Sequence, residues 1–184
     1  MGQYYKPMLI NPEKKNAEKI IKWWYSFNYG LNGLKLMEHS YYGNKFVNVV
    51  ENELINNPQH LVWAGDYADS ENDEGWYNLY DFSGEIPDDK DGNTDVLGEG
   101  YFVVNHTKKQ YYDRDEMEKQ NFEKRYEVSI NPLPLLTAEG NGRGGGDYHS
   151  DINKELVGVW ARDLIEVTAE LPSDYEKITP YFME

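Results

Sequence analysis

The amino-acid sequence predicts an α+β fold, a single domain with a mainly antiparallel sheet and one or two helices. Short apolar or alternating segments recur along the chain between turn residues, which is typical of antiparallel strands. Tyrosine is abundant, with 16 copies among 184 residues. Its ring packs on half-buried strand faces while its hydroxyl stays in water. We expect one domain over residues 1–184, with an acidic surface loop at about 84–100 and a C-terminal tail at about 171–184.

The N-terminal part of the chain predicts a strand and then two segments that each fit two structures. Residues 3–10 are expected to form a strand, and Pro7 indicates an edge or a bulge because proline cannot donate to the ladder. Residues 16–24 fit a short amphipathic helix or, from residue 20 onward, a strand. Residues 34–39 fit a short strand or the start of a helix.

The clearest helix is predicted directly after Gly43 and Asn44, because asparagine is a favoured N-cap. The apolar residues that follow at helical spacing are Phe46, Val47, Val50, Leu54 and Ile55. Residues 56–58 should end the helix, since the residue before Pro58 is biased away from helical backbone. We expect the apolar stripe of this helix to pack on the sheet.

The rest of the chain is expected to be mostly strands. The expected strands are 60–64, 76–82, 101–105, 109–113, 126–130, 156–161 and 164–167. Two of them, 101–105 and 109–113, should pair as a hairpin. Residues 114–123 are rich in charge and predict a helix, whereas residues 132–137 are expected to be irregular.

Charge and composition narrow the functional classes. The chain carries 18 Lys and Arg against 33 Asp and Glu, a formal charge of −15, so its field should repel duplex nucleic acid and anionic membranes. It has no cysteine, which excludes disulfides, thiolate catalysis and cysteine-based zinc sites. No apolar run approaches the roughly 20 residues of a membrane helix, and no signal peptide is evident. We therefore expect a cytoplasmic protein, in a bacterium or an infected host cell.

Several local strings carry a family resemblance. They are Gly2-Gln3-Tyr4-Tyr5, residues 33–40 (GLKLMEHS), 63–69 (WAGDYAD), 104–109 (VNHTKK), 140–147 (GNGRGGGD) and 157–163 (VGVWARD). This set resembles a family of small proteins from bacteria and their phages that has no established activity, so it implies no catalytic residues. Relatives tend to have Trp-Ala-Gly-Asp where this chain has Arg162 in third place. If that glycine has a positive φ, Arg162 must be accommodated differently.

The glycine-rich segment is the leading candidate for a ligand site. Residues 140–146 contain five glycines, which let backbone N–H groups approach a phosphate or carboxylate without hindrance from Cβ atoms. Arg143 would add a planar set of donors. The predicted ligand-binding residues are Thr137, Asn141, Gly142, Arg143, Gly144, Gly145, Gly146, Asp147, Tyr148 and His149. The alternatives are a structural loop closed by Arg143 and Asp147, and a loop that binds a partner protein.

Secondary candidates combine carboxylates with histidine. Glu38 and His39, together with Asp66 and Asp69, have the groups for acid–base chemistry or a divalent metal. The alternative is that these side chains cap helices and satisfy loops. His106, at the expected hairpin tip, is a basic spot that could meet an anion or simply serve the turn. No histidine spacing fits zinc, and residues 89–100 only imitate the start of a calcium loop, so we expect no metal and no cofactor.

The sequence favours a non-catalytic binding protein. We expect a small anionic or nucleotide-like ligand that carries few phosphates, held by a phage-type sequestering protein acting against host defence. One alternative is an acidic interaction module that inhibits a basic partner, such as a host protein. A second alternative is a metal-dependent hydrolase built on the carboxylates, although no nucleophile motif supports it. Self-association is compatible with each of these functions.

Overall fold

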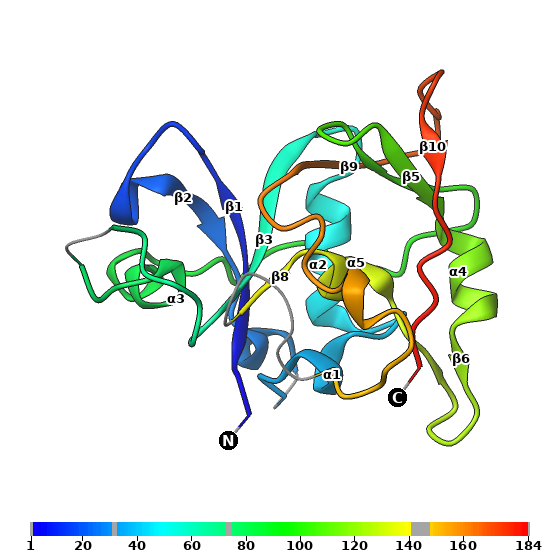
Figure 1. Ribbon diagram of the computed structural model, residues 1–184, viewed down its shortest axis with the longest axis horizontal. Helices are drawn as coiled ribbons and strands as arrows, with labels where there is room; N and C mark the ends of the chain where they lie inside the picture. Colours follow the sequence, from blue (N-terminus) through cyan, green and yellow to red (C-terminus); the bar gives the residue numbers. More distant parts are fainter. Residues whose placement is uncertain (1, 31–32, 73–74, 141–147, 184) are drawn as a thin grey trace.

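The computed structural model describes residues 2–30, 33–72, 75–140 and 148–183. Its strands are β1 (Tyr5–Ile10), β2 (Ile20–Trp23), β3 (Gln59–Gly65), β4 (Phe102–Asn105), β5 (Gln110–Asp113), β6 (Phe122–Glu123), β7 (Val128–Ser129), β8 (Ala138–Glu139), β9 (Leu164–Thr168) and β10 (Glu176–Lys177). The main sheet has the order β10-β5-β4-β9-β3-β1-β2, with β8 paired to β3 (Figure 1). Only the β10–β5 and β3–β8 pairs of this sheet are parallel, which confirms the predicted α+β fold with a mainly antiparallel sheet.

Helical segments connect the strands. The α-helices are α1 (Leu36–His39), α2 (Lys45–Glu53), α3 (Leu79–Phe82), α4 (Arg114–Gln120) and α5 (Pro132–Leu136). The 3-10 segments are η1 (Asn16–Lys19), η2 (Ser26–Tyr29), η3 (Ser83–Glu85) and η4 (Lys154–Leu156). None of the helices in the described part of the chain is both long and apolar enough to cross a bilayer.

Successive side chains of β1 and β3 point to opposite faces of the sheet, and a separate hydrophobic core covers each face. Leu9 and Trp63 belong to the main core, which includes the apolar residues of α2 and α5. Met8 and Val62, the neighbouring residues along the strands, belong to a smaller core with the apolar residues of α3. Figure 1 shows α2 near the centre of the molecule and α3 at the β1–β2 end. This part of the sheet is therefore covered on both faces.

The predicted main helix is confirmed in place and in phase. The Asn44 side chain caps α2 by accepting a hydrogen bond from the Phe46 N–H at 2.9 Å. Beyond the helix, Asn56 turns the chain with a left-handed φ of 50°. The residues of the predicted stripe that are fully buried are Phe46, Val47, Val50 and Leu54.

We expect Asn44→Ala to lower the free energy of unfolding by about 1 kcal/mol, because the Phe46 N–H loses its acceptor at the helix start. Asn44→Ser keeps a capping oxygen and is the matched control, with an expected loss of a few tenths of a kcal/mol. Urea unfolding of the two variants measures the difference. Equal losses would contradict the capping role.

Two predicted strands are wrong, and each was overridden by turn chemistry. The segment 76–82 contains α3 instead, because Asn78 accepts from the Asp81 N–H at 3.0 Å and Asp81 accepts in return from the Asn78 N–H at 3.2 Å. Residues 156–161 form turns after η4, because Gly158 has a left-handed φ of 81°. Residues 132–137, expected to be irregular, contain α5, which starts at Asn131 as N-cap and Pro132 as first residue.

Other segments follow the sequence more closely. Residues 16–24 use both predicted structures in turn, with η1 followed by β2. The predicted hairpin is confirmed as β4 and β5. Pro7 lies in an interior strand rather than at an edge, but its carbonyl accepts from the Trp24 N–H at 3.3 Å, where the pairing with β2 ends. Pro7 therefore lies just beyond the last residue pair of β1 and β2, where a proline without an N–H is tolerated. In the C-terminal tail, Phe182 is fully buried against the Tyr148 ring.

Candidate functional site

The glycine-rich ligand site predicted at residues 141–147 lies outside the described residues, so it stays a prediction. Its described neighbours serve the fold. Thr137 is fully buried, and its hydroxyl donates to the Leu133 carbonyl at 2.7 Å. Tyr148 is buried and donates to the Ile152 carbonyl at 2.7 Å. His149 is exposed.

The start of this segment is closely packed against two other strings of the suspected family. A Cβ atom on Gly140 would lie 2.4 Å from Gln3 Oε1, so the Gln3 side chain would have to shift if any other residue stood there. Gln3 Oε1 also accepts from the Tyr5 hydroxyl at 2.5 Å, and the Tyr5 N–H donates to the Leu34 carbonyl at 2.8 Å. Strings that are far apart in the sequence thus meet at one end of β1 and β8.

The string around Trp63 joins them through a buried histidine. Trp63 Nε1 donates to His39 Nε2 at 2.8 Å, so the His39 proton sits on Nδ1 and the ring is neutral. His39 is fully buried, and burial lowers its pKa to about 3, an effect that the Gly33 carbonyl opposes only in part. His39 therefore acts as a core residue that positions Trp63.

The predicted acid–base cluster is not assembled around His39. Glu38 is exposed, and its carboxylate accepts from the Lys35 N–H at 3.1 Å at the start of α1. Asp66 accepts from the Tyr4 N–H at 3.0 Å. Asp69 is exposed. Within the described ranges, no group of three or more His, Asp and Glu side chains is placed to hold a metal ion.

His106 is part of a polar chain at the β4–β5 turn. Its Nε2 lies 2.7 Å from Glu166 Oε2 and its Nδ1 lies 2.9 Å from the Tyr175 hydroxyl. Beside it, Lys108 and Asn105 both donate to Asp163 Oδ2, at 2.7 and 2.8 Å. These contacts tie the turn to β9 and to the C-terminal segment.

A cavity that the sequence did not predict lies at the other end of β1. It has a volume of about 650 Å³, within the roughly 300–1,000 Å³ of small-molecule sites. We call it the lysine cavity, and its lining residues are Pro12, Glu13, Lys14, Lys15, Asn16, Lys19, Glu71 and Asn72. Three lysines against two glutamates give it a positive lining on a chain of charge −15. The signal in the sequence is the Lys14-Lys15 pair after the first strand.

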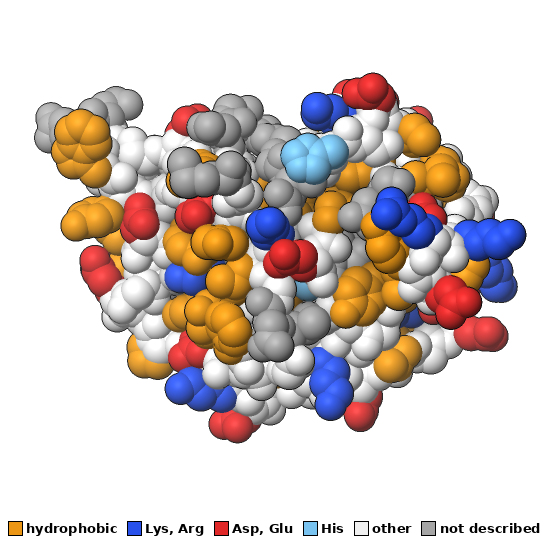
Figure 2. Space-filling view, turned by 90° about the horizontal axis from the view of Figure 1, so that it is seen from below, with side chains coloured by type: hydrophobic (Ala, Val, Ile, Leu, Met, Phe, Trp, Pro, Cys, Tyr) orange, Lys and Arg blue, Asp and Glu red, His pale blue; other side chains and the backbone are white. Residues whose placement is uncertain are grey.

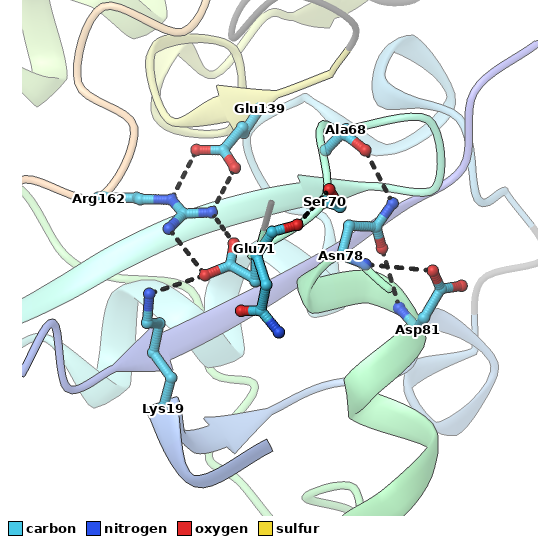
Figure 3. A network of polar contacts seen from close by, with 9 residues as sticks. Lys19, Ala68, Ser70, Glu71, Asn78, Asp81, Glu139 and Arg162 are labelled. Carbon is cyan, nitrogen blue, oxygen red and sulfur yellow. Dashed lines mark hydrogen bonds and ion pairs between the residues drawn. The ribbon is translucent and has the colours of Figure 1, made fainter. Parts of the chain in front are cut away.

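Glu71 anchors an ion-pair network at this cavity (Figure 3). Its carboxylate is 4% exposed and accepts from Lys19 Nζ at 2.7 Å and from Arg162. Arg162 also pairs with Glu139 through both carboxylate oxygens, at 2.7 and 2.6 Å. Burial alone would raise the Glu71 pKa, but the hydrogen bonds from Arg162 and Lys19 outweigh it, and the pKa lies below its ordinary value. Glu71 is therefore ionised and already neutralised.

Arg162 adopts the left-handed backbone with φ 68°, a conformation that favours glycine. Its carbonyl accepts from His60 Nδ1 at 2.8 Å, which leaves His60 Nε2 as an acceptor. Its side chain bridges Glu71 and Glu139, the residue before Gly140. One residue thus connects the lysine cavity to His60 and to the start of the glycine-rich segment.

A second cavity of about 310 Å³ adjoins the lysine cavity, and the two share Pro12 and Glu13. We call it the apolar cavity. Its lining residues are Ile10, Asn11, Pro12, Glu13, Ile21, Pro58, Gln59, His60 and Leu164. Glu13 is the one residue in this lining with a permanent charge.

The surface opposite these cavities mixes charge and hydrophobic groups. Figure 2 shows Lys and Arg side chains interspersed with Asp and Glu on this face, and groups of hydrophobic side chains, one of them on the left half. Exposed aromatic residues of the chain include Tyr4, Phe27, Tyr67, Trp76 and Tyr77.

Comparisons with protein-family models, with curated proteins and with solved structures found no match to the chain.

Proposed function

We propose that the protein binds a small phosphate-bearing molecule in the lysine cavity and sequesters it unchanged. The observation that carries this proposal is a positively lined cavity of about 650 Å³ on a strongly acidic chain. Lysine is a common binder of phosphate as a point charge. The absence of cysteine agrees with a role in the cytoplasm, of a bacterium or an infected host cell.

The lysines of the cavity differ in their availability. Lys19 is committed to Glu71, with 2.7 Å between nitrogen and oxygen. Lys14 and Lys15 are exposed, and neither side chain forms an ion pair within the described part of the chain. Because Arg162 and Lys19 already neutralise Glu71, the charge of Lys14 and Lys15 is left for a ligand.

The same network favours retention of the ligand over its conversion. A catalytic carboxylate must be free to take a proton or to activate water. The Glu71 oxygens instead accept hydrogen bonds from Lys19 and Arg162, which hold the carboxylate in its ionised form. The acidic field of the whole protein opposes highly charged anions at long range, so a ligand with few phosphates is favoured.

Ribose 5-phosphate, titrated at low salt with calorimetric detection, tests the proposal. We expect binding that the double variant Lys14→Met, Lys15→Met weakens at least 10-fold, since charge-assisted contacts are worth about 1.5–3 kcal/mol. The double variant Lys45→Met, Lys119→Met is the matched control, because both lysines are exposed and lie outside the cavity lining. Absence of binding, or equal weakening by both double variants, would contradict the proposal.

A second readout separates sequestration from hydrolysis. The ligand is incubated with the protein, released by heat and analysed by chromatography, and we expect it to be recovered intact. Dephosphorylated product that depends on the protein would favour the hydrolase alternative. Arg143→Ala tests the glycine-rich segment in the same assay: loss of binding in this variant, with none in the lysine variant, would move the site to that segment.

A further inference from the structure

We infer that the apolar cavity takes the base of the same ligand, so that the ligand class is a nucleoside 5′-monophosphate. This inference rests on the proposed function of the lysine cavity. The two cavities adjoin along Pro12 and Glu13, one lined by lysines and the other mainly by aliphatic side chains. A molecule that combines an anionic group with a flat, poorly charged ring matches this division.

The lining of the apolar cavity is suited to a ring and not to a second phosphate. It contains no lysine or arginine to hold an anion. Ile21, Pro58 and Leu164 supply apolar surface that a base can cover. The volume of about 310 Å³ is at the low end of the range for ligand sites, which fits one ring system.

The polar atoms of this cavity are hydrogen-bond acceptors. His60 donates its Nδ1 proton to the Arg162 carbonyl, so Nε2 of the neutral ring is an acceptor. Gln59 donates through Nε2 to Asn57 at 3.0 Å, and its carbonyl oxygen has no partner among the described residues. Acceptors of this kind match the N–H donors of a nucleobase.

Glu13 occupies the wall between the two cavities. Within the described part of the chain its carboxylate forms no ion pair, and only its backbone N–H is held, by Asn11 Oδ1 at 3.0 Å. A carboxylate in this position can accept from sugar hydroxyls, the contact that acidic residues make with ribose in dinucleotide-binding sites. The order phosphate, sugar and base thus matches lysine cavity, Glu13 and apolar cavity.

Arg162 gives the two halves a common support. Its guanidinium holds Glu71 in the lysine cavity, and its carbonyl orients the His60 ring in the apolar cavity. The Arg162 N–H is itself fixed by the Leu61 carbonyl at 2.8 Å. Arg162 therefore contacts one lining residue of each cavity, Glu71 in the lysine cavity and His60 in the apolar cavity.

The test compares AMP with ribose 5-phosphate by calorimetric titration of the full chain. We expect AMP to bind at least 10-fold more tightly, because ribose 5-phosphate leaves the apolar cavity empty. In the double variant Ile21→Ser, His60→Ala this ratio should fall below 3, while the affinity for ribose 5-phosphate stays unchanged. Ile152→Ser is the matched control, since Ile152 is 41% exposed and lies outside both linings.

The outcomes distinguish the two proposals. Equal affinity for AMP and ribose 5-phosphate, with binding that still depends on Lys14 and Lys15, would overturn the base site and leave the proposed function in place. A ratio that survives in the Ile21→Ser, His60→Ala variant would also overturn it, because the base would then bind elsewhere. Failure of AMP alone to bind would overturn the base site only, whereas failure of both ligands to bind would overturn both proposals. Thermal unfolding of each variant without ligand verifies that it is folded.

Discussion

Replacing Arg114 by methionine is expected to lower the free energy of unfolding by about 3–5 kcal/mol, because the change leaves the Glu51 carboxylate buried without a counter-charge. Glu51 in α2 and Arg114 at the start of α4 have 0% and 1% of their side chains exposed. Two hydrogen bonds join them, each of 3.1 Å. Asn131 Nδ2 donates to the same carboxylate at 2.8 Å.

The rest of this buried site cannot replace the arginine. The Tyr42 ring lies 4.8 Å from the centre of the Arg114 guanidinium. The Tyr42 and Tyr112 hydroxyls are buried and have no hydrogen-bond partner among the described residues. Burial raises the pKa of both phenols well above the ordinary value, so they stay neutral and offer Glu51 no charge. The loss of stability in this variant therefore comes from keeping the Glu51 carboxylate buried without a counter-charge.

Urea unfolding of three variants measures this effect. Lys177→Met removes a positive charge from an exposed ion pair with Glu116 and should cost less than about 1 kcal/mol. The double variant Glu51→Leu, Arg114→Met should recover most of the loss, because it removes both charges from the interior. If Arg114→Met alone does not fold, recovery in the double variant still identifies the buried charge as the cause. A loss below 1 kcal/mol for Arg114→Met would contradict this account.

This buried pair shows where sequence reasoning on the fold stops. The helix α2 was predictable because its cap and its apolar stripe are local patterns around Asn44 and Leu54. Glu51 and Arg114 are 63 positions apart, and each has the pattern of an exposed charge on its own helix. Only the fold, which brings the start of α4 within reach of the Glu51 side chain, makes them partners. The misassigned segments have a different cause, since caps such as Asn78 outweighed alternating hydrophobicity.

Less of the candidate site than of the fold could be predicted from the sequence. The Lys14-Lys15 pair is a local signal in the sequence, but the lysine cavity also needs Glu71, and the apolar cavity needs His60 and Leu164. These residues belong to segments that meet only through the sheet, so no spacing along the chain reveals them. The string around Arg162 was recognised as unusual, yet its role in joining Glu71 to Glu139 depends on three separate segments.

Protein stability is expected to fall by about 2 kcal/mol between pH 7 and pH 5 through His39 alone. In the folded state burial holds the His39 pKa at about 3, whereas the unfolded chain has the ordinary value near 6.5. Below pH 6.5 the unfolded state therefore binds a proton that the folded state excludes. Stability from this group is complete above pH 6.5 and is lost as the pH falls toward 3, at about 1.4 kcal/mol per pH unit.

The variant His39→Gln isolates this contribution. The glutamine carbonyl can accept from Trp63 Nε1 in place of His39 Nε2, so the buried N–H keeps a partner and only the titration is removed. We expect a flatter dependence of the unfolding free energy on pH from 7 to 5 than in the unmodified protein. The other histidines and all carboxylates are common to both proteins and cancel in the difference. His149→Asn, at an exposed position, should leave the slope unchanged. The same slope in the His39→Gln variant and the unmodified protein would show that the folded state does not exclude the His39 proton, because a group that binds protons equally in the folded and unfolded states contributes nothing to the pH dependence.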